Sequence, residues 1–160
     1  MTNAHAFSFT TIEGKTLPMS GYKGKAVLVV NTASACGFTP QYKGLEALWK
    51  AYKDKGLIVL GVPSNDFGAQ EPGSESEIKE FCEMRYGVDF PLTSKVHVTG
   101  SAAHPLYQWI AKELGEGGAP RWNFHKYLIG KDGSIAGAFN SKVAPEGAEL
   151  KQAIDAALTA

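Results

Sequence analysis

Ala26-Val27-Leu28-Val29-Val30 is the stretch that decides the fold of this 160-residue chain. It is short, continuous and rich in β-branched residues, which is typical of a strand buried on both faces of a sheet. A second run of the same character, Leu57-Ile58-Val59-Leu60-Gly61-Val62, ends at Pro63. Between the two runs, apolar residues follow the spacing of one buried helical face: Leu45, Leu48, Trp49 and Tyr52. We therefore expect a strand–helix–strand unit.

Strand and helix patterns also alternate on either side of this unit. Phe7 and Phe9 alternate with polar residues before Gly14-Lys15, which predicts an opening β-hairpin. Ser74 and Glu77 form a capping box, which predicts a helix whose inner face holds Ile78, Phe81 and Cys82.

The second half of the chain predicts two more helices and a hairpin. One helix is expected to start at Pro105 and the other at Pro145. The hairpin is expected around Gly130-Lys131-Asp132-Gly133. The residues expected to face inward from the two helices are Leu106, Trp109, Ile110, Leu114, Leu150, Ile154 and Leu158. No repeat or linker divides the chain, so we expect one α/β domain over residues 1–160, with a central mixed sheet covered by helices on both faces.

The composition excludes several functional classes. Sixteen basic and sixteen acidic residues give a net charge of zero, so we expect no nucleic-acid partner and no stable membrane association. The amino terminus lacks the basic and apolar regions of a secretory signal, and we expect a cytoplasmic protein. Two cysteines in a reducing compartment predict a transient disulfide at most. The Cys and His spacing predicts no metal site, and we expect no cofactor.

Cys36 is the first candidate for chemistry. It lies between the first strand and a helix start at which Thr39 is the expected cap and Pro40 suits the first turn. Helix starts favour the thiolate, which is the reactive form of a thiol. The alternative is a small buried hydrophobic side chain, a common role for a free cysteine.

Two other segments are expected to converge on Cys36. Active sites of open α/β sheets lie at the carboxyl ends of the strands, which places the loop 63–73 near Cys36. The segment 120–126 reaches the same edge if its strand belongs to an antiparallel hairpin.

Three blocks in this order resemble the cysteine-containing members of the glutathione peroxidase family: residues 31–39, residues 65–73 and Trp122-Asn123-Phe124. Phe90-Pro91 adds to the match, which spans essentially the whole chain. The resemblance implies a thioredoxin-like fold and a peroxidatic Cys36, with Gln70, Trp122 and Asn123 completing a catalytic tetrad.

Those residue types suit the reduction of a hydroperoxide. A thiolate attacks the O–O bond and becomes a sulfenic acid. Amide and indole N–H groups of Gln70, Asn123 and Trp122 orient the peroxide and stabilise the departing oxygen. Taken singly, each residue has an ordinary alternative role: Gln70 in its own loop, Trp122 as a half-buried aromatic, Asn123 in a turn or cap.

Cys82 has two interpretations. Its position on an apolar helical face favours a buried structural thiol. The resemblance instead implies a resolving cysteine, which forms a disulfide with the oxidised Cys36 that thioredoxin reduces. A disulfide requires Cα atoms within about 7 Å, so we expect local unwinding of the helix between the reduced and oxidised forms.

The chain departs from familiar members of the family. Ser64 stands where many members have a third cysteine, and Asp66 replaces a usual Gln and is expected to point away from Cys36. Arg121 and His125 also differ. The short passage 112–120 leaves no room for the assembly loop of tetrameric members, so we expect a monomer that admits bulky lipid hydroperoxides. Nothing resembles a dedicated glutathione site, which makes thioredoxin the preferred reductant over glutathione.

Competing functions use the same thiol. Thr39 stands where a local dithiol would need a second cysteine, which excludes Cys-x-x-Cys chemistry. A cysteine hydrolase pairing Cys36 with His125 and Asn123 is the weaker alternative. A peroxide sensor that passes its oxidation to a partner protein shares the first step with a peroxidase, and the sequence does not separate the two.

Overall fold

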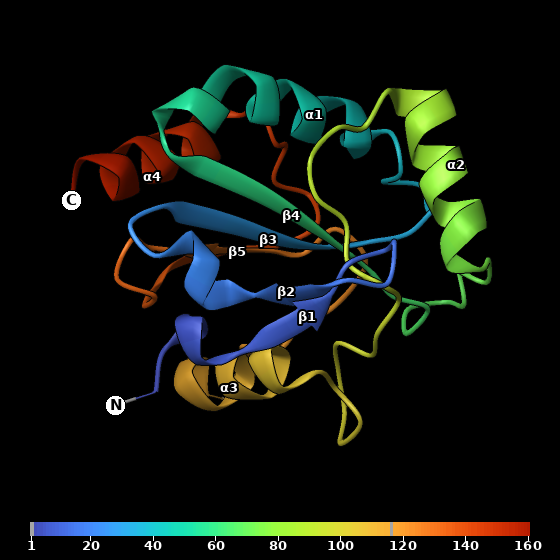
Figure 1. The fold of residues 1–160 in the computed structure, drawn as a ribbon, viewed down its shortest axis with the longest axis horizontal. Helices are drawn as coiled ribbons and strands as arrows, with labels where there is room; N and C mark the ends of the chain where they lie inside the picture. Colours follow the sequence, from blue (N-terminus) through green and yellow to red (C-terminus); the bar gives the residue numbers. More distant parts are fainter. Residues whose placement is uncertain (1, 116) are drawn as a thin grey trace.

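A four-stranded mixed sheet forms the centre of the computed structural model, which describes residues 2–115 and 117–160 (Figure 1). The strand order is β4-β3-β5-β6. β3 pairs with β4 in parallel and with β5 antiparallel, and β5 pairs with β6 antiparallel. The bounds of these strands are β3 Ala26–Thr32, β4 Leu57–Pro63, β5 Lys126–Ile129 and β6 Ile135–Phe139.

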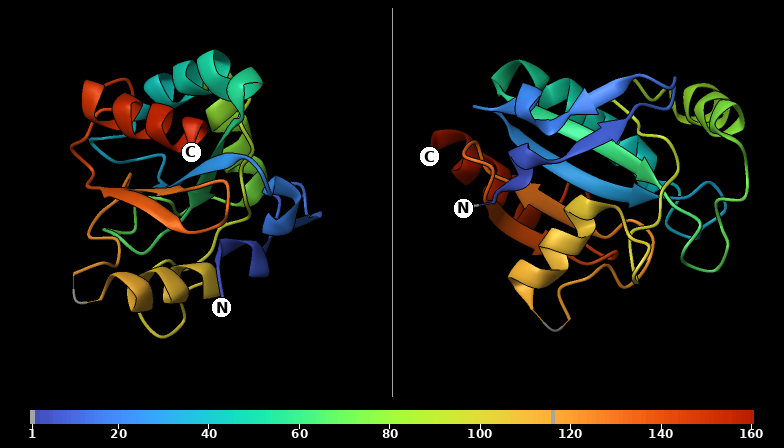
Figure 2. Two further views of the ribbon diagram at one scale, coloured as in Figure 1. Left: turned by 90° about the vertical axis from the view of Figure 1, so that its left-hand side faces the viewer. Right: turned by 60° about the horizontal axis from the view of Figure 1, so that its bottom comes forward.

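Helices cover both faces of this sheet (Figure 2). α1 (Gln41–Tyr52) and α4 (Ala148–Thr159) lie over one face, with α2 (Glu75–Tyr86) beside α1. α3 (Pro105–Leu114) lies under the other face. β3 is buried along its whole length, and alternate residues enter the two cores: Leu28 and Val30 on the α1 side, Val27 and Val29 on the α3 side.

A small hairpin precedes the sheet. β1 (Ser8–Thr10) and β2 (Thr16–Pro18) pair antiparallel, and short 3-10 helices cover Ala4–Ala6, Met19–Tyr22 and Lys53–Lys55. The expected α/β class, mixed sheet, flanking helices and opening hairpin are all confirmed. Among the described residues, no helix is long and apolar enough to cross a membrane.

Most local predictions hold. The capping box at the start of α2 is present, with the Ser74 hydroxyl accepting from the Glu77 N–H and the Glu77 carboxylate accepting from the Ser74 N–H. The hairpin around residues 130–133 is also present, and it joins β5 to β6.

Three local predictions are wrong. Thr39 does not cap α1, because its hydroxyl binds the turn that holds Cys36; Pro40 is the N-cap, without a side-chain bond. The last helix begins at Ala148 and not at Pro145, which lies in the preceding turn. Leu114 is 38% exposed at the end of α3, whereas Tyr107 of the same helix, which was not expected to face inward, is buried.

Candidate active site

Three chain segments meet where β3 ends. The Ala35 N–H donates to the carbonyl of Gln70, which joins the turn after β3 to the loop after β4. The buried Asn31 side chain donates to the carbonyl of Trp122 at 2.9 Å, and the Phe124 N–H donates to the Asn31 carbonyl. These bonds tie the segment before β5 to the same edge, so the expected convergence is found.

Cys36 lies in a tight turn in front of α1. Its backbone N–H donates to the Thr39 hydroxyl at 2.9 Å, and that hydroxyl donates to the Ala33 carbonyl. The Phe38 N–H points at the Cys36 Sγ atom, 3.3 Å away. The thiol is nearly buried and is not in a disulfide. A backbone donor aimed at sulfur stabilises a thiolate, and here it comes from the turn, whereas the helix itself begins only at Gln41.

Gln70 and Asn123 are in direct contact. The Asn123 side-chain amide donates to the Gln70 Oε1 atom at 2.9 Å and to the Phe67 carbonyl at 3.3 Å. Because Asn123 donates to the Gln70 Oε1 atom, the Gln70 N–H₂ group can donate to another acceptor. Two uncharged side chains from distant segments thus form one hydrogen-bonded unit.

Trp122 packs against the same loop. Its ring centroid lies 5.8 Å from that of Phe67. At Gly68, whose φ is +68°, an added Cβ would lie 3.0 Å from the Trp122 ring and 3.4 Å from the Gln70 side chain. Glycine at this position therefore lets the indole and the Gln70 side chain share one close-packed region.

Two non-glycine residues with left-handed backbone lie in this region. Apart from glycines, the only described residues with positive φ are Ala69 (51°) and Phe124 (63°). Each directly adjoins a candidate residue, Gln70 or Asn123. Such conformations cost roughly 1–3 kcal/mol and persist only where surrounding contacts impose them, commonly at functional sites.

The Asp66 carboxylate binds a neighbouring segment. It accepts from the N–H groups of Val98 and Thr99 and pairs with His97 Nδ1 at 2.6 Å. Burial raises the pKa of Asp66, but these donors outweigh it and the pKa is lowered. The carboxylate that we expected to point away from Cys36 is thus bonded to residues 97–99.

Cys82 is fully buried inside α2, as its helical position predicted. Burial raises the pKa of its thiol to about 11; the Tyr42 hydroxyl opposes this shift, and the carboxylates of Glu71 and Glu83 add to it. Both cysteines are free thiols in this structure. In this structure Cys82 is therefore a protonated, weak nucleophile.

Glu71 is a functional-site neighbour that sequence reasoning missed. Its side chain is 1% exposed, and burial raises the pKa of its carboxyl against the lowering effects of Ser34 and Lys95. It directly follows Gln70, and its N–H donates to the Asn65 side chain at 2.8 Å. Asn31 was missed in the same way, since a polar residue at the end of a buried strand carries no local signal of its long-range partner.

One cavity adjoins the candidate site, and a larger one lies elsewhere on the sheet. The first, of about 350 Å³, is lined by Phe38, Trp122, Arg121, His125 and Lys142, together with Asn140 and Ser141. Burial, with the nearby basic groups Lys126 and Arg121 adding, lowers the pKa of His125 to about 4, so its imidazole is neutral at pH 7.

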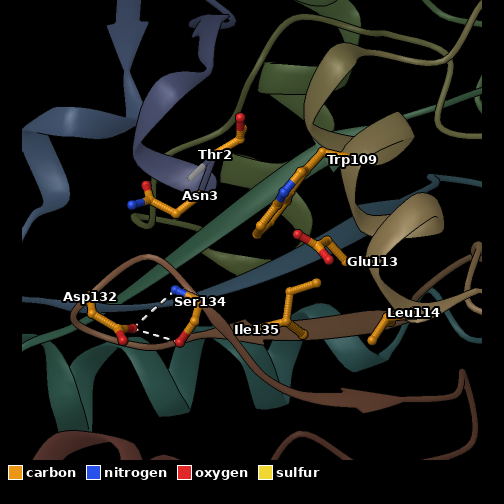
Figure 3. Close-up of a pocket in the computed structure, with 8 residues that line it drawn as sticks. All are labelled: Thr2, Asn3, Trp109, Glu113, Leu114, Asp132, Ser134 and Ile135. Carbon is orange, nitrogen blue, oxygen red and sulfur yellow. Dashed lines mark hydrogen bonds between the residues drawn. The ribbon is translucent and has the colours of Figure 1, made fainter.

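The other cavity, of about 470 Å³, is remote from Cys36. Figure 3 shows Trp109 and Glu113 of α3 facing Ser134 and Ile135 across it. Ile135 pairs with Ile129, which itself pairs with Val27 near the start of β3. Cys36 follows the other end of that strand.

Comparisons with known proteins identify the family. The family model for glutathione peroxidase matches residues 4–111. The glutathione peroxidase-like peroxiredoxin gpx1 of Schizosaccharomyces pombe is 51% identical over 136 residues, which cover 84% of this chain and 86% of that protein. The hydroperoxy fatty acid reductase Gpx2 of a Synechocystis species is 50% identical over 151 residues, covering 94% and 96%. The chain belongs to the glutathione peroxidase family, and it is a peroxidase.

Solved structures agree with this assignment. The crystal structure of Trgpx in apo form has a TM-score of 0.80 and 39% identity, and the match covers 99% of this chain and 97% of that one. A thioredoxin family thiol:disulfide interchange protein from Chlorobium tepidum, 20% identical, has a TM-score of 0.72 with 98% and 96% coverage. The fold is therefore thioredoxin-like.

Gly68→Ala tests the close packing of Trp122 and Gln70. The added methyl group meets both side chains, and a left-handed alanine costs about 1–2 kcal/mol. We expect the oxidation of Cys36 by hydrogen peroxide, followed by stopped-flow fluorescence, to slow by about 10-fold or more. Gly14→Ala is the matched control: its φ is +92°, but no atom lies within 4 Å of the added Cβ. Equal slowing in both variants would show that backbone strain alone is responsible.

The raised pKa of Cys82 predicts a pH-dependent contribution to stability. An unfolded thiol titrates near about 8.5, whereas the folded one titrates at about 11, so the folded state keeps its proton longer. The stabilisation is complete below about pH 8.5 and is lost as the pH rises to about 11. Under reducing conditions, the difference in unfolding free energy between the wild type and Cys82→Ala should therefore shrink by about 2 kcal/mol from pH 7 to above pH 10.5. A constant difference would contradict the burial of this thiol.

Proposed function

We propose that this protein is a monomeric, single-domain, thioredoxin-dependent peroxidase in which Cys36 reduces hydrogen peroxide and organic or lipid hydroperoxides. The observation that carries the proposal is the joining of the Cys36 turn, Gln70, Trp122 and Asn123 at one edge of the sheet. The residues match the family tetrad, and the backbone donor on the Cys36 sulfur suits a thiolate.

In the first step, the Cys36 thiolate attacks one peroxide oxygen and the O–O bond breaks. The sulfur gains an OH group as sulfenic acid, and the other oxygen leaves as alkoxide, which takes up the proton lost by the thiol. Donors from Gln70 and Trp122 stabilise the charge on that departing oxygen. Both N–H groups of the Asn123 amide are taken by the Gln70 Oε1 atom and the Phe67 carbonyl, so Asn123 holds the Gln70 amide in place before the substrate arrives.

In the second step, Cys82 attacks the sulfenic acid, a Cys36–Cys82 disulfide forms and water leaves. While α2 is intact, the buried and protonated Cys82 is a poor nucleophile. Unwinding of α2 brings it into water and toward Cys36. Two thiols of thioredoxin then exchange with the disulfide and return both cysteines to the reduced form.

The preferred reductant and the cellular compartment follow from this cycle. Ser64 leaves Cys82 as the sole partner thiol in the chain, which favours an internal disulfide over a mixed one with glutathione. A compartment that keeps thioredoxin reduced is required, and we place the protein in the cytoplasm. The short 112–120 passage supports a monomer; residue 116 within it lies outside the described residues.

Cys82→Ser separates the resolving role from a structural one. We expect Cys36 to be oxidised at the wild-type rate once, after which turnover with thioredoxin, thioredoxin reductase and NADPH falls by about 100-fold or more because no disulfide forms. The same enzyme is assayed with glutathione and glutathione reductase as the competing reductant. Steady turnover of the variant with thioredoxin, or faster wild-type turnover with glutathione, would refute this cycle.

The cavity beside Phe38 and Trp122 supports a substrate preference. Its aromatic walls suit an acyl chain, and Arg121 and Lys142 line it with positive charge. In Arg121→Ala/Lys142→Ala, we expect the KM for a long-chain hydroperoxide with a free carboxylate to rise about 5- to 10-fold, with the hydrogen peroxide rate unchanged. Lys25→Ala/Lys55→Ala removes the same charge at exposed positions preceding β3 and β4. An equal KM change in both double variants would indicate a general charge effect.

The other functions have less support. The neutral His125, with a pKa of about 4, is a weak base for a cysteine hydrolase. A peroxide sensor would show the same Cys36 oxidation with slow thioredoxin turnover and rapid transfer of the disulfide to a partner protein, and the coupled assay distinguishes that outcome.

A further inference from the structure

Lys126 is a buried amine with no counterion. Its side chain is fully buried at the start of β5, among the largest enclosed side chains of the protein. In the described part of the chain, no carboxylate forms an ion pair with it. His125, which directly precedes it in the chain, is neutral at pH 7, and burial alone lowers the pKa of Lys126. A lysine in such a place is unfavourable for folding unless its amine makes essential contacts.

The contacts of this amine are two backbone carbonyls. Its Nζ atom donates to the Phe124 carbonyl at 2.8 Å and to the Ser141 carbonyl at 3.4 Å. A neutral amine has two N–H donors, so these two acceptors satisfy it, whereas an ammonium would have a third N–H and an uncompensated charge. In agreement, burial lowers the pKa of Lys126 to about 7.

Both carbonyls belong to segments that border the candidate site. Phe124 has the strained left-handed conformation, and Trp122 and Asn123 directly precede it. The Ser141 carbonyl also accepts from the side chain of Gln41, the first residue of α1, at 2.7 Å. The amine thus links the Trp122–Asn123 turn to the start of the helix that follows Cys36.

We propose that Lys126 is a positioning residue for peroxide reduction: its buried amine fixes the strained Phe124 turn, and with it Trp122 and Asn123, relative to the Cys36 turn. This inference rests on the function proposed above. Lys126 does not touch the substrate, and it acts through the backbone of Phe124 and Ser141.

Lys126→Met tests the proposal, because methionine fills a similar volume without donors. We expect the oxidation of Cys36 by hydrogen peroxide to slow by about 10- to 100-fold, since displaced donors no longer stabilise the leaving oxygen. Alkylation of Cys36 by iodoacetamide requires only the thiolate and should change by less than about threefold. Lys131→Met is the matched control, because Lys131 also donates to a carbonyl, that of Leu158, in the hairpin remote from the site.

Folding stability provides a second readout, because Lys126→Met should gain stability while it loses peroxide reactivity. The folded pKa of Lys126, about 7, lies below the unfolded value of about 10.4, so its burial destabilises the protein fully below pH 7 and progressively less as the pH rises. Lys126→Met should therefore fold, and its stability relative to the wild type should be higher at pH 7 than at pH 9.5. We therefore expect Lys126→Met, compared with the wild type, to gain stability at pH 7 and to react more slowly with peroxide.

Several outcomes would overturn the proposal. A folded Lys126→Met with unchanged peroxide reactivity, or with equal losses in peroxide oxidation and alkylation, leaves Lys126 a merely structural residue. In the wild type, NMR signals of the Trp122 indole and the Asn123 amide should titrate with the Lys126 amine, and that of the Trp109 indole should not. Absence of this shared titration refutes the proposal even if the variant does not fold. Slow oxidation of wild-type Cys36 itself would instead refute the proposed function.

Discussion

β3 lies between a parallel neighbour and an antiparallel one, and the candidate site depends on this arrangement. Parallel pairing with β4 places the loop after Pro63 beside the turn after Thr32. Antiparallel pairing with β5 sets Val30 opposite Lys126, so the residues that precede β5 reach the same edge. A parallel β5 would carry those residues to the far end of the sheet. The site therefore exists because one sheet joins both pairings around a single buried strand.

Long-range hydrogen bonds then hold together the segments that the strand pairing brings to this edge. Asn31, the penultimate residue of β3, binds the Trp122 segment with its side chain and its carbonyl. Gln70 accepts from Ala35 through its backbone and from Asn123 through its side chain. Each segment is thus bound to both of the others. Such mutual support allows left-handed backbone at Ala69 and Phe124, which an isolated loop would avoid.

The fold was largely predictable because its signals are local. Continuous apolar runs identified β3 and β4, and the capping box located the start of α2. One wrong prediction concerns a residue with two competing local roles: Thr39 had the chemistry of a cap, but the Cys36 turn holds its hydroxyl. The convergence of the site was predictable from strand ends. The burial of Glu71 and Lys126 was not, because charged residues normally stay in water and no local pattern marks the exceptions.

Several unfavourable features of this protein adjoin the candidate site. A buried amine, a buried carboxyl and two strained residues all adjoin the segments that carry Gln70, Trp122 and Asn123. One further buried carboxyl, that of Glu46 in α1, accepts from the N–H groups of Asp89 and Phe90. Packing alone does not explain this distribution, since apolar replacements would fill the same volumes with less strain and less desolvation. The proposed role of the site, which needs uncharged donors in a fixed arrangement, accounts for it. Cys82 is likewise a weak nucleophile while it is buried, because its raised pKa keeps the thiol protonated.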